Sequence, residues 1–306
     1  MNRRPHAGLI CQIIIWTACA ASVAAPLPKV SDADFKGPGV CQFATHGFTL
    51  TAATDSAVNH SVRQLIERHR AVFGFQTRPD FRVRLRLFGS YTDYTNATFS
   101  LYWTNTEDRR SLAGRPFNVA GFYTPATKEI VTWRQQMAGF LGTTLLHEAG
   151  HAILDAHYEN VPMWLMEGSA DYFAFALHPP GEVQQQLIRH RWTKLAEWRQ
   201  AKSLPSMEQL LDVDALGFRA MESEKSYGAS WSLFQMLMST PAYRQMVVTL
   251  VNERQLGRGP NAPEPCSRQI ERLHPGGVAK LEAAWHAWIA SGSRATNALP
   301  VRPSVR

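Results

Sequence analysis

The hydrophobic pattern of this 306-residue chain changes once, near Gln136, and that change limits the folds open to it. Strand and helix patterns are mixed before this point, whereas apolar residues recur with helical spacing almost to the end after it. Helices are predicted over 139–158, 162–177, 182–201, 227–239, 241–256 and 277–291. We therefore expect an α+β protein: a small mixed N-terminal part over 25–136, a mainly helical part over 137–291, and a disordered tail over 292–306.

The mixed part contains one predicted helix, from Ser56 to Phe73, and a half-buried strand in "FRVRLRLFG". In this strand apolar and basic residues alternate strictly: Phe81, Val83, Leu85 and Leu87 against Arg82, Arg84 and Arg86. We expect the arginine face to be solvated rather than ligand-binding. In "GFYTPATKEIVTW", "TPATKE" predicts a turn before a further strand from Glu129 to Trp133.

The first residues have the pattern of a secretory signal. Arg3 and Arg4 precede an apolar run from Gly8 to about Val23, and the small residues of "ASVAAPLP" follow. The run is too short to span a membrane comfortably. The sequence predicts a signal peptide over 1–24, export to the periplasm or the medium, and no stable membrane span after processing.

Two alternatives to simple cleavage stay open. A lipoprotein signal would use Cys19, but Trp16 occupies a position where such signals carry a small aliphatic residue, which argues against anchoring there. In the second alternative, residues 1–24 are not cleaved off and remain as a signal anchor.

Composition narrows the class of protein. The chain is 45% hydrophobic and 19% charged, which is ordinary for a globular protein and argues against disorder. Its formal net charge of +7 stays mildly basic without the signal peptide and is not concentrated in a basic block. This charge suits anionic surroundings such as the cell envelope and gives no indication of nucleic-acid binding.

Signal cleavage would also leave only two cysteines, Cys41 and Cys266. In an oxidising compartment they could form one disulfide that joins the two ends of the fold. Two separate buried thiols are an equally good interpretation.

The stretch "TTLLHEAGHAILDAHY" lies within the predicted helix 139–158. Residues four apart on a helix share a side, so His147 and His151 can direct two imidazoles at one ion. Glu148 would flank the open coordination position. This arrangement is the one that zinc-dependent hydrolysis requires.

The next predicted helix, in "VPMWLMEGSADYFAFAL", carries Glu167 and Asp171 four residues apart on one face. A catalytic zinc usually has three protein ligands, so Glu167 is a candidate for the third. Asp171 would accept a hydrogen bond from the far nitrogen of a ligand histidine. As an alternative, the two acids serve as caps or ion-pair partners, although burying them without a cation would be costly.

Together, "HEAGH" and "WLMEGSADY" resemble the gluzincin group of zinc metallopeptidases, and more narrowly the peptidase MA-like exported proteins. The resemblance implies one Zn²⁺ per chain held by His147, His151 and Glu167. It makes Glu148 the general base and places Asp171 behind a ligand histidine. The spacer from His151 to Glu167 is short for the group.

The resemblance extends loosely over 110–240 and suggests two further features. "GFYTPATKEIVTW" would be the edge strand beside which an extended substrate lies, or else a simple hairpin. In "SYGASWSLFQML", Tyr227 would donate a hydrogen bond to the oxyanion, or else be a core tyrosine. His157 and His190 are treated as bystanders.

The sequence thus predicts an exported zinc metallopeptidase that hydrolyses peptide bonds through a metal-activated water. Its substrate would be a protein or peptide, or cell-envelope material. A secreted zinc-containing binding or scaffold protein without turnover is the alternative from another class. Hydrolysis of a non-peptide amide or ester is a third possibility.

Overall fold

The structure is a computed structural model that describes residues 31–102, 119–134, 138–177, 182–256 and 264–292. The strands are β1 (Cys41–His46), β2 (Val83–Phe88), β3 (Gly121–Thr124) and β4 (Glu129–Trp133). The helices of the N-terminal part are the short η1 (Asp32–Asp34), α1 (Ala52–Phe73), α2 (Tyr91–Ala97) and the π-helical η2 (Thr98–Tyr102).

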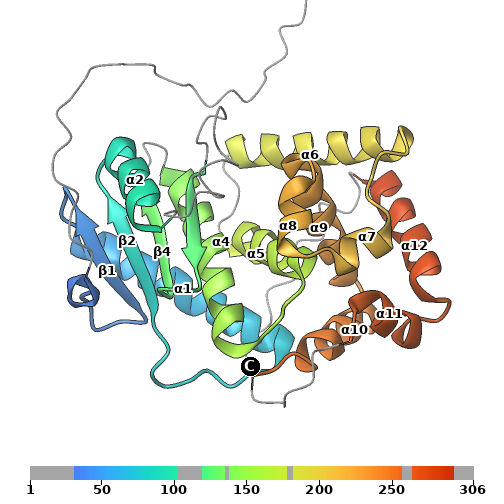
Figure 1. Ribbon diagram of the computed structural model, residues 1–306, viewed down its shortest axis with the longest axis horizontal. Coiled ribbons are helices and arrows are strands. Elements are labelled where there is room, and N and C mark those ends of the chain that lie inside the picture. Colours follow the sequence, from blue (N-terminus) through green and yellow to red (C-terminus); the bar gives the residue numbers. More distant parts are fainter. Residues whose placement is uncertain (1–30, 103–118, 135–137, 178–181, 257–263, 293–306) are drawn as a thin grey trace, which may run out of the picture.

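All the named elements of the C-terminal part are helices among its described residues. Its elements are α4 (Ala138–His157), α5 (Met163–Leu177), α6 (Glu182–Gln200), α7 (Met207–Asp212), α8 (Ala215–Ala220), α9 (Ser223–Leu237), α10 (Pro241–Asn252), α11 (Cys266–Leu273) and α12 (Gly277–Ser291). Figure 1 shows the sheet on one side, the later helices on the other, and α4 and α5 between them. The protein is therefore α+β, as predicted.

The four strands form one mixed sheet in the order β1-β2-β4-β3. β1, β2 and β4 are parallel, with Cys41 opposite Val83 and Arg84 opposite Glu129, while β3 runs antiparallel to β4. β1 and β3 are thus the two edges. The predicted turn between β3 and β4 is present. β3 lies beside α4, so the "GFYTPATKEIVTW" hairpin forms the sheet edge nearest the helix that carries His147 and His151.

The alternation in β2 determines how the sheet is covered. Val83, Leu85 and Leu87 are buried in the main core, which also contains residues of α1, α4, α5 and α9. Phe88 faces the opposite side, where it packs with Tyr94 of α2 in a smaller cluster. Both faces of the sheet are therefore covered, so the sheet is not half-exposed as its sequence pattern suggested.

The expectation of a solvated arginine face is wrong for Arg86, whose side chain is only 1% exposed. Its Nε donates to Glu129 Oε2 at 2.6 Å, and its Nη1 lies 3.3 Å from Asp34 Oδ2. The ring of Phe35 covers the guanidinium, with its centroid 4.7 Å from Cζ. The segment before β1 folds over this face, which strand periodicity alone could not reveal. Arg82 is exposed, as expected.

The six helices predicted after Gln136 begin and end within a few residues of their predicted positions. Local pattern was less informative in the N-terminal part, where β1 and α2 were not predicted. α1 also starts earlier than expected, because the Thr51 side chain accepts a hydrogen bond from the Thr54 amide and caps the helix. The short α7, α8 and α11 were missed too, since six to eight residues give little helical periodicity.

Cys41 and Cys266 are separate buried thiols, so the disulfide interpretation is not supported. Cys266 instead accepts a contact from Arg254 at 3.2 Å. The predicted signal peptide and nearly all of the predicted tail lie outside the described residues. Among the described helices, none is both long enough and apolar enough to cross a membrane.

Gly168 allows α5 and α9 to approach closely. A Cβ at Gly168 would lie 2.5 Å from the Ser230 carbonyl oxygen and 3.0 Å from Phe234 Cβ. Gly168→Ala is therefore expected to lower the free energy of unfolding by about 1–3 kcal/mol, measured by urea denaturation. Gly228→Ala is the matched control, since its Cβ would meet Trp198 at an ordinary 3.5 Å. Equal behaviour of the two variants would contradict the close contact.

Candidate metal centre

Two successive helices bring three potential metal ligands to one point. On α4, His147 and His151 are one turn apart, and their Nε2 atoms are separated by 3.1 Å. On α5, Glu167 directs Oε2 to within 3.2 Å of His147 Nε2 and 3.4 Å of His151 Nε2. The predicted ligand set is thus assembled as a compact triangle of donor atoms.

The size and chemistry of this triangle fit a zinc ion. Zinc–ligand bonds of 2.0–2.1 Å in a tetrahedron place the ligand atoms about 3.3 Å apart. Glu167 Oε2 is buried and has no hydrogen-bond partner among the described residues. A buried carboxylate oxygen without a partner is costly, and a bound cation would satisfy it. Two imidazole nitrogens and one carboxylate are also a known catalytic zinc donor set.

Asp171 orients one of the two histidines, as its sequence position predicted. Its Oδ1 lies 2.8 Å from His147 Nδ1, and an ionised carboxylate can only accept, so Nδ1 is the donor. His147 Nε2 therefore faces the triangle. Arg191 of α6 donates from Nη1 to Asp171 Oδ2 at 2.5 Å and so fixes the other carboxylate oxygen.

Arg191 is itself held in place by aromatic rings. Its Cζ lies 5.4 Å from the ring centroid of Phe175 and 5.6 Å from that of Trp231. The chain Arg191–Asp171–His147 thus links α6, α5 and α4 and ends at the metal-ligand triangle.

Glu148 lies close to the triangle and could itself offer a carboxylate oxygen to an ion held by His147 and His151. Its ligand atoms and those of His147 and His151 lie within 4.8 Å of one another. Its Oε2 accepts a hydrogen bond from the backbone amide of Tyr123 in β3 at 2.7 Å. The candidate base is therefore bound to the edge strand.

The charges of the site shift the pKa values of its members in opposite directions. Burial raises the pKa of Glu148, partly offset by the nearby His147 and His151. Burial also acts on Glu167, but the charges of His151 and His147 outweigh it and hold the pKa of Glu167 far below its usual value. The charges thus favour the anionic form of Glu167, whereas burial makes Glu148 easier to protonate.

The pKa of His147 also departs from its usual value. Burial opposes protonation, yet the hydrogen bond to Asp171 and the nearby carboxylate of Glu167 raise the pKa of His147 well above its ordinary value. Because a metal binds only the deprotonated nitrogen, protons compete with a metal for this ring. Zinc affinity is therefore expected to rise with pH.

Tyr227 lies on α9, half-buried, with its ring 5.5 Å from that of Phe218. Burial raises the pKa of Tyr227, and the negative charges of Glu167 and Glu148 add to this shift. Both interpretations of Tyr227 stay predictions. His157 is buried, with Nδ1 on the carbonyl of its own helix, and the exposed His190 contacts Glu224.

Three residues around the site were not identified from sequence: Arg191, Tyr123 and Asp155. The arginine sits in a strongly polar helix that gave no signal of a function. Tyr123 was noticed only as part of an edge strand. Asp155 follows His151 at helical spacing and could have been found by extending the same helix face by one turn.

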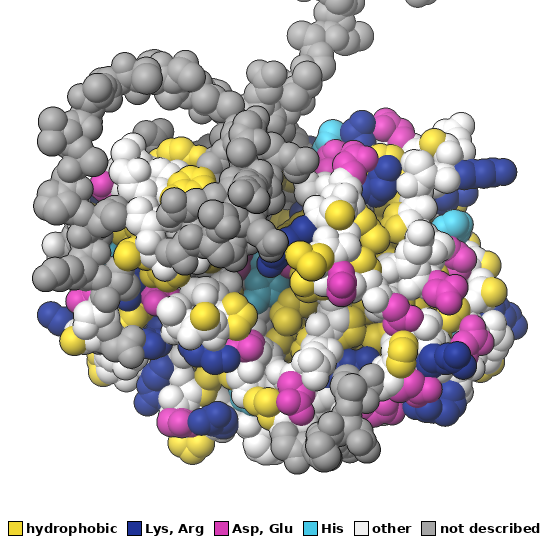
Figure 2. Space-filling model, viewed as in Figure 1, with side chains coloured by type: hydrophobic (Ala, Val, Ile, Leu, Met, Phe, Trp, Pro, Cys, Tyr) yellow, Lys and Arg dark blue, Asp and Glu magenta, His cyan; other side chains and the backbone are white. Residues whose placement is uncertain are grey.

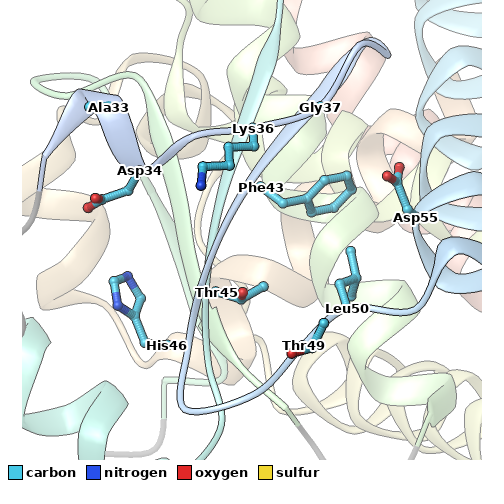
Figure 3. A pocket seen from close by; sticks show the side chains of 10 residues that line it. All are labelled: Ala33, Asp34, Lys36, Gly37, Phe43, Thr45, His46, Thr49, Leu50 and Asp55. Carbon is cyan, nitrogen blue, oxygen red and sulfur yellow. The ribbon is translucent and has the colours of Figure 1, made fainter.

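The surface is hollowed between the two halves of the protein (Figure 2). Figure 2 shows histidine atoms at the bottom of this hollow, between the sheet half and the helical half. A separate pocket of about 550 Å³ lies along β1, at the other edge of the sheet from β3. Asp34 and His46 lie on one side of β1 in this pocket, and Phe43 and Leu50 on the other (Figure 3).

The pocket along β1 is chemically distinct from the metal-ligand triangle. Asp34 and His46 both contact Arg86 Nη1, at 3.3 and 3.1 Å. These two side chains therefore support the buried Arg86 of the sheet. The metal-ligand triangle, and not this pocket, is our candidate functional site.

Asp171→Asn is expected to weaken zinc binding by roughly 10–100-fold without abolishing it, because the ligand histidine loses its charged orienting partner. The measurement is a competition titration against a chromogenic chelator. Glu224→Gln is a suitable control, since it changes an exposed carboxylate bonded to His190. Wild-type affinity in Asp171→Asn would show that the contact with His147 does not support the metal.

Comparison with known proteins gives one match. Residues 142–254 match the family described as a protein of unknown function (DUF1570). This segment runs from within α4 to the end of α10 and contains all three ligands of the triangle. It covers less than half of the chain. No curated protein and no solved structure matches the chain.

Proposed function

We propose that this protein is an exported zinc metallopeptidase of the gluzincin type. The observation that carries the proposal is the triangle of His147, His151 and Glu167, whose donor atoms are 3.1–3.4 Å apart. Its support from Asp171 and the adjacent Glu148 are the other parts that metal-assisted hydrolysis needs.

Each site residue has a distinct role in this proposal. His147, His151 and Glu167 hold one Zn²⁺, and Asp171 keeps His147 in the correct tautomer. When bound, zinc acts as a Lewis acid that lowers the pKa of a coordinated water to about 7 and polarises a carbonyl. Glu148 supplies the proton acceptor.

The catalytic work of the chain itself is proton transfer by Glu148. The pKa of Glu148 is raised towards neutral pH, and a carboxylate with such a pKa can both accept a proton and return it. It takes a proton from water at the start of the reaction and gives it to the leaving amine at the end. Tyr227 is the candidate donor to the oxyanion.

The substrate of the proposed reaction is a protein, a peptide or cell-envelope material. β3 is an edge strand beside α4. An extended segment could pair there with the backbone groups of β3 that the bond between the Tyr123 amide and Glu148 leaves free. Its short length, Gly121–Thr124, limits such pairing to a few residues. Export rests on the signal-like N-terminus alone.

The decisive test is metal content paired with activity. Purified mature protein should contain one zinc per chain, and His147→Ala, His151→Ala and Glu167→Ala should each lose most of it, because two donors hold zinc too weakly. His190→Ala is the matched control, as this histidine is exposed and outside the triangle. Full zinc occupancy in any ligand variant would remove that residue from the set.

The same preparations separate the proposed enzyme from a zinc-containing binding protein. Wild type should hydrolyse at least one member of a panel of denatured proteins, peptides and cell-wall fragments, and the ligand variants should not. Stoichiometric zinc without turnover on the whole panel would favour the binding or scaffold alternative.

A further inference from the structure

Tyr123 of the edge strand β3 bonds to two residues of α4, the helix that carries His147 and His151. The backbone amide of Tyr123 donates to Glu148 Oε2 at 2.7 Å, and its phenol donates to Asp155 Oδ2 at 2.6 Å. Glu148 and Asp155 are seven residues apart, two helical turns on one side of α4. β3 is thus attached to α4 at two points by a single side chain and its own backbone.

The attachment at Asp155 is reinforced from the turn after β3. Lys128 Nζ also lies 2.6 Å from Asp155 Oδ2. Lys128 is 60% exposed, whereas Asp155 is 24% exposed, so solvent screens the lysine more than the tyrosine contact. Burial, followed by the bond to Asp155, raises the pKa of Tyr123, which therefore stays a protonated donor.

The position of this strand matters because a fixed amide restricts the rotation of a carboxylate. With Glu148 Oε2 bound to the Tyr123 amide, Oε1 is the oxygen left to accept a proton. A shift of β3 by a fraction of an ångström would lengthen the 2.7 Å bond and free the carboxylate to rotate. Misplaced groups of this kind lower rates strongly in preorganised sites.

We propose that Tyr123 is a positioning residue for Glu148, and that its bond to Asp155 keeps the edge strand where its amide can hold the carboxylate. We call this bond between Tyr123 Oη and Asp155 the strand clasp. The catalytic consequence rests on the proposed function of Glu148, whereas the clasp itself is a statement about structure. The two parts can therefore be tested separately.

The structural part is tested by the Tyr123 amide signal in protein labelled with ¹⁵N-tyrosine, which gives few signals because the chain has eight tyrosines. Loss of one signal in Tyr123→Phe assigns it. An amide bound to a carboxylate resonates downfield and exchanges slowly, so Glu148→Gln should move it upfield. Asp155→Ala should move it in the same direction and speed its exchange by roughly fivefold or more. Tyr158→Phe is the matched control.

The control removes a comparable hydroxyl elsewhere. Tyr158 lies just beyond the end of α4 and is 2% exposed. Its Oη donates to the Phe73 carbonyl oxygen at 3.4 Å. It should leave the Tyr123 amide unchanged. An unchanged Tyr123 amide in Asp155→Ala would overturn the clasp, whatever the protein hydrolyses.

The catalytic part is tested by a double-mutant cycle. Tyr123→Phe should lower kcat by about tenfold, the equivalent of one lost hydrogen bond to a charged group, with zinc content unchanged. In the Glu148→Gln background the same change should lower kcat less than about twofold, because the carboxylate to be positioned is gone. Equal losses in both backgrounds would overturn the positioning role.

Failures of folding and of the proposed function remain distinguishable from failure of the clasp. Asp155→Ala replaces a partly exposed helical residue by a good helix former, so it tests the same contact if Tyr123→Phe does not fold. If wild type proves to have no activity, the proposed function is wrong, and the amide measurements alone decide the clasp.

Discussion

Glu148→Gln is expected to lower hydrolysis by at least about a hundredfold while zinc content and thermal stability survive. Glutamine keeps the size of the side chain, and its carbonyl can still accept the Tyr123 amide. It cannot take up a proton from water. A general base typically contributes 10²–10⁴-fold to the rate, so the loss should appear in kcat rather than in KM.

The control for this variant is Glu159→Gln, which makes the same chemical change at an exposed position just after α4. Its activity should match wild type. Loss of zinc from Glu148→Gln would mean that Glu148 is a ligand and would question the place of Glu167 in the triangle. Retained activity would show that another group accepts the proton.

The largest effect on stability is expected from Glu129→Gln. The variant leaves the guanidinium of Arg86 buried with only the partly exposed Asp34 as a charged partner. Breaking a buried ion pair from one side typically costs about 3–5 kcal/mol, so the free energy of unfolding in urea should fall by that amount. Tyr102 also loses its charged acceptor, since its hydroxyl bonds the same carboxylate at 3.2 Å.

Two further variants make this result interpretable. Asp80→Asn changes the exposed pair with Arg78 and should have little effect on stability. The double variant Arg86→Met/Glu129→Leu should recover much of the loss, because it leaves no buried unpaired charge. Asp34 also loses Arg86, but its carboxylate is partly exposed to water. If Glu129→Gln lowered the free energy of unfolding no more than Asp80→Asn, the buried ion pair would not contribute to stability.

The metal-ligand triangle could be predicted from sequence because its geometry is local. His147 and His151 are fixed by helical spacing, and α5 follows α4 after a short connection that allows little choice in where Glu167 falls. Asp171 follows by the same rule. The helix boundaries were predictable for a similar reason, since long amphipathic segments carry their own periodicity.

The parts that sequence missed depend on contacts between distant segments. Arg86 looked solvated because its strand alternates, and only the fold brings Glu129 and Phe35 against it. Tyr123 gave no sign that its phenol would reach α4. Arg191 likewise lies in a polar helix, and its bond to Asp171 exists only once the fold brings the two side chains together.

The short separation of the metal ligands along the chain also has a consequence for the order of folding. His147 meets His151 over four residues and Asp171 over 24, whereas Arg86 meets Glu129 over 43. Closing a shorter loop costs less entropy and is faster. The α4–α5 hairpin can therefore gather its donors while the strands are still unpaired. A chain that takes up its ion at this stage would dock the sheet onto a preformed centre, with β3 the first strand to reach it, because Tyr123 meets Glu148 over only 25 residues.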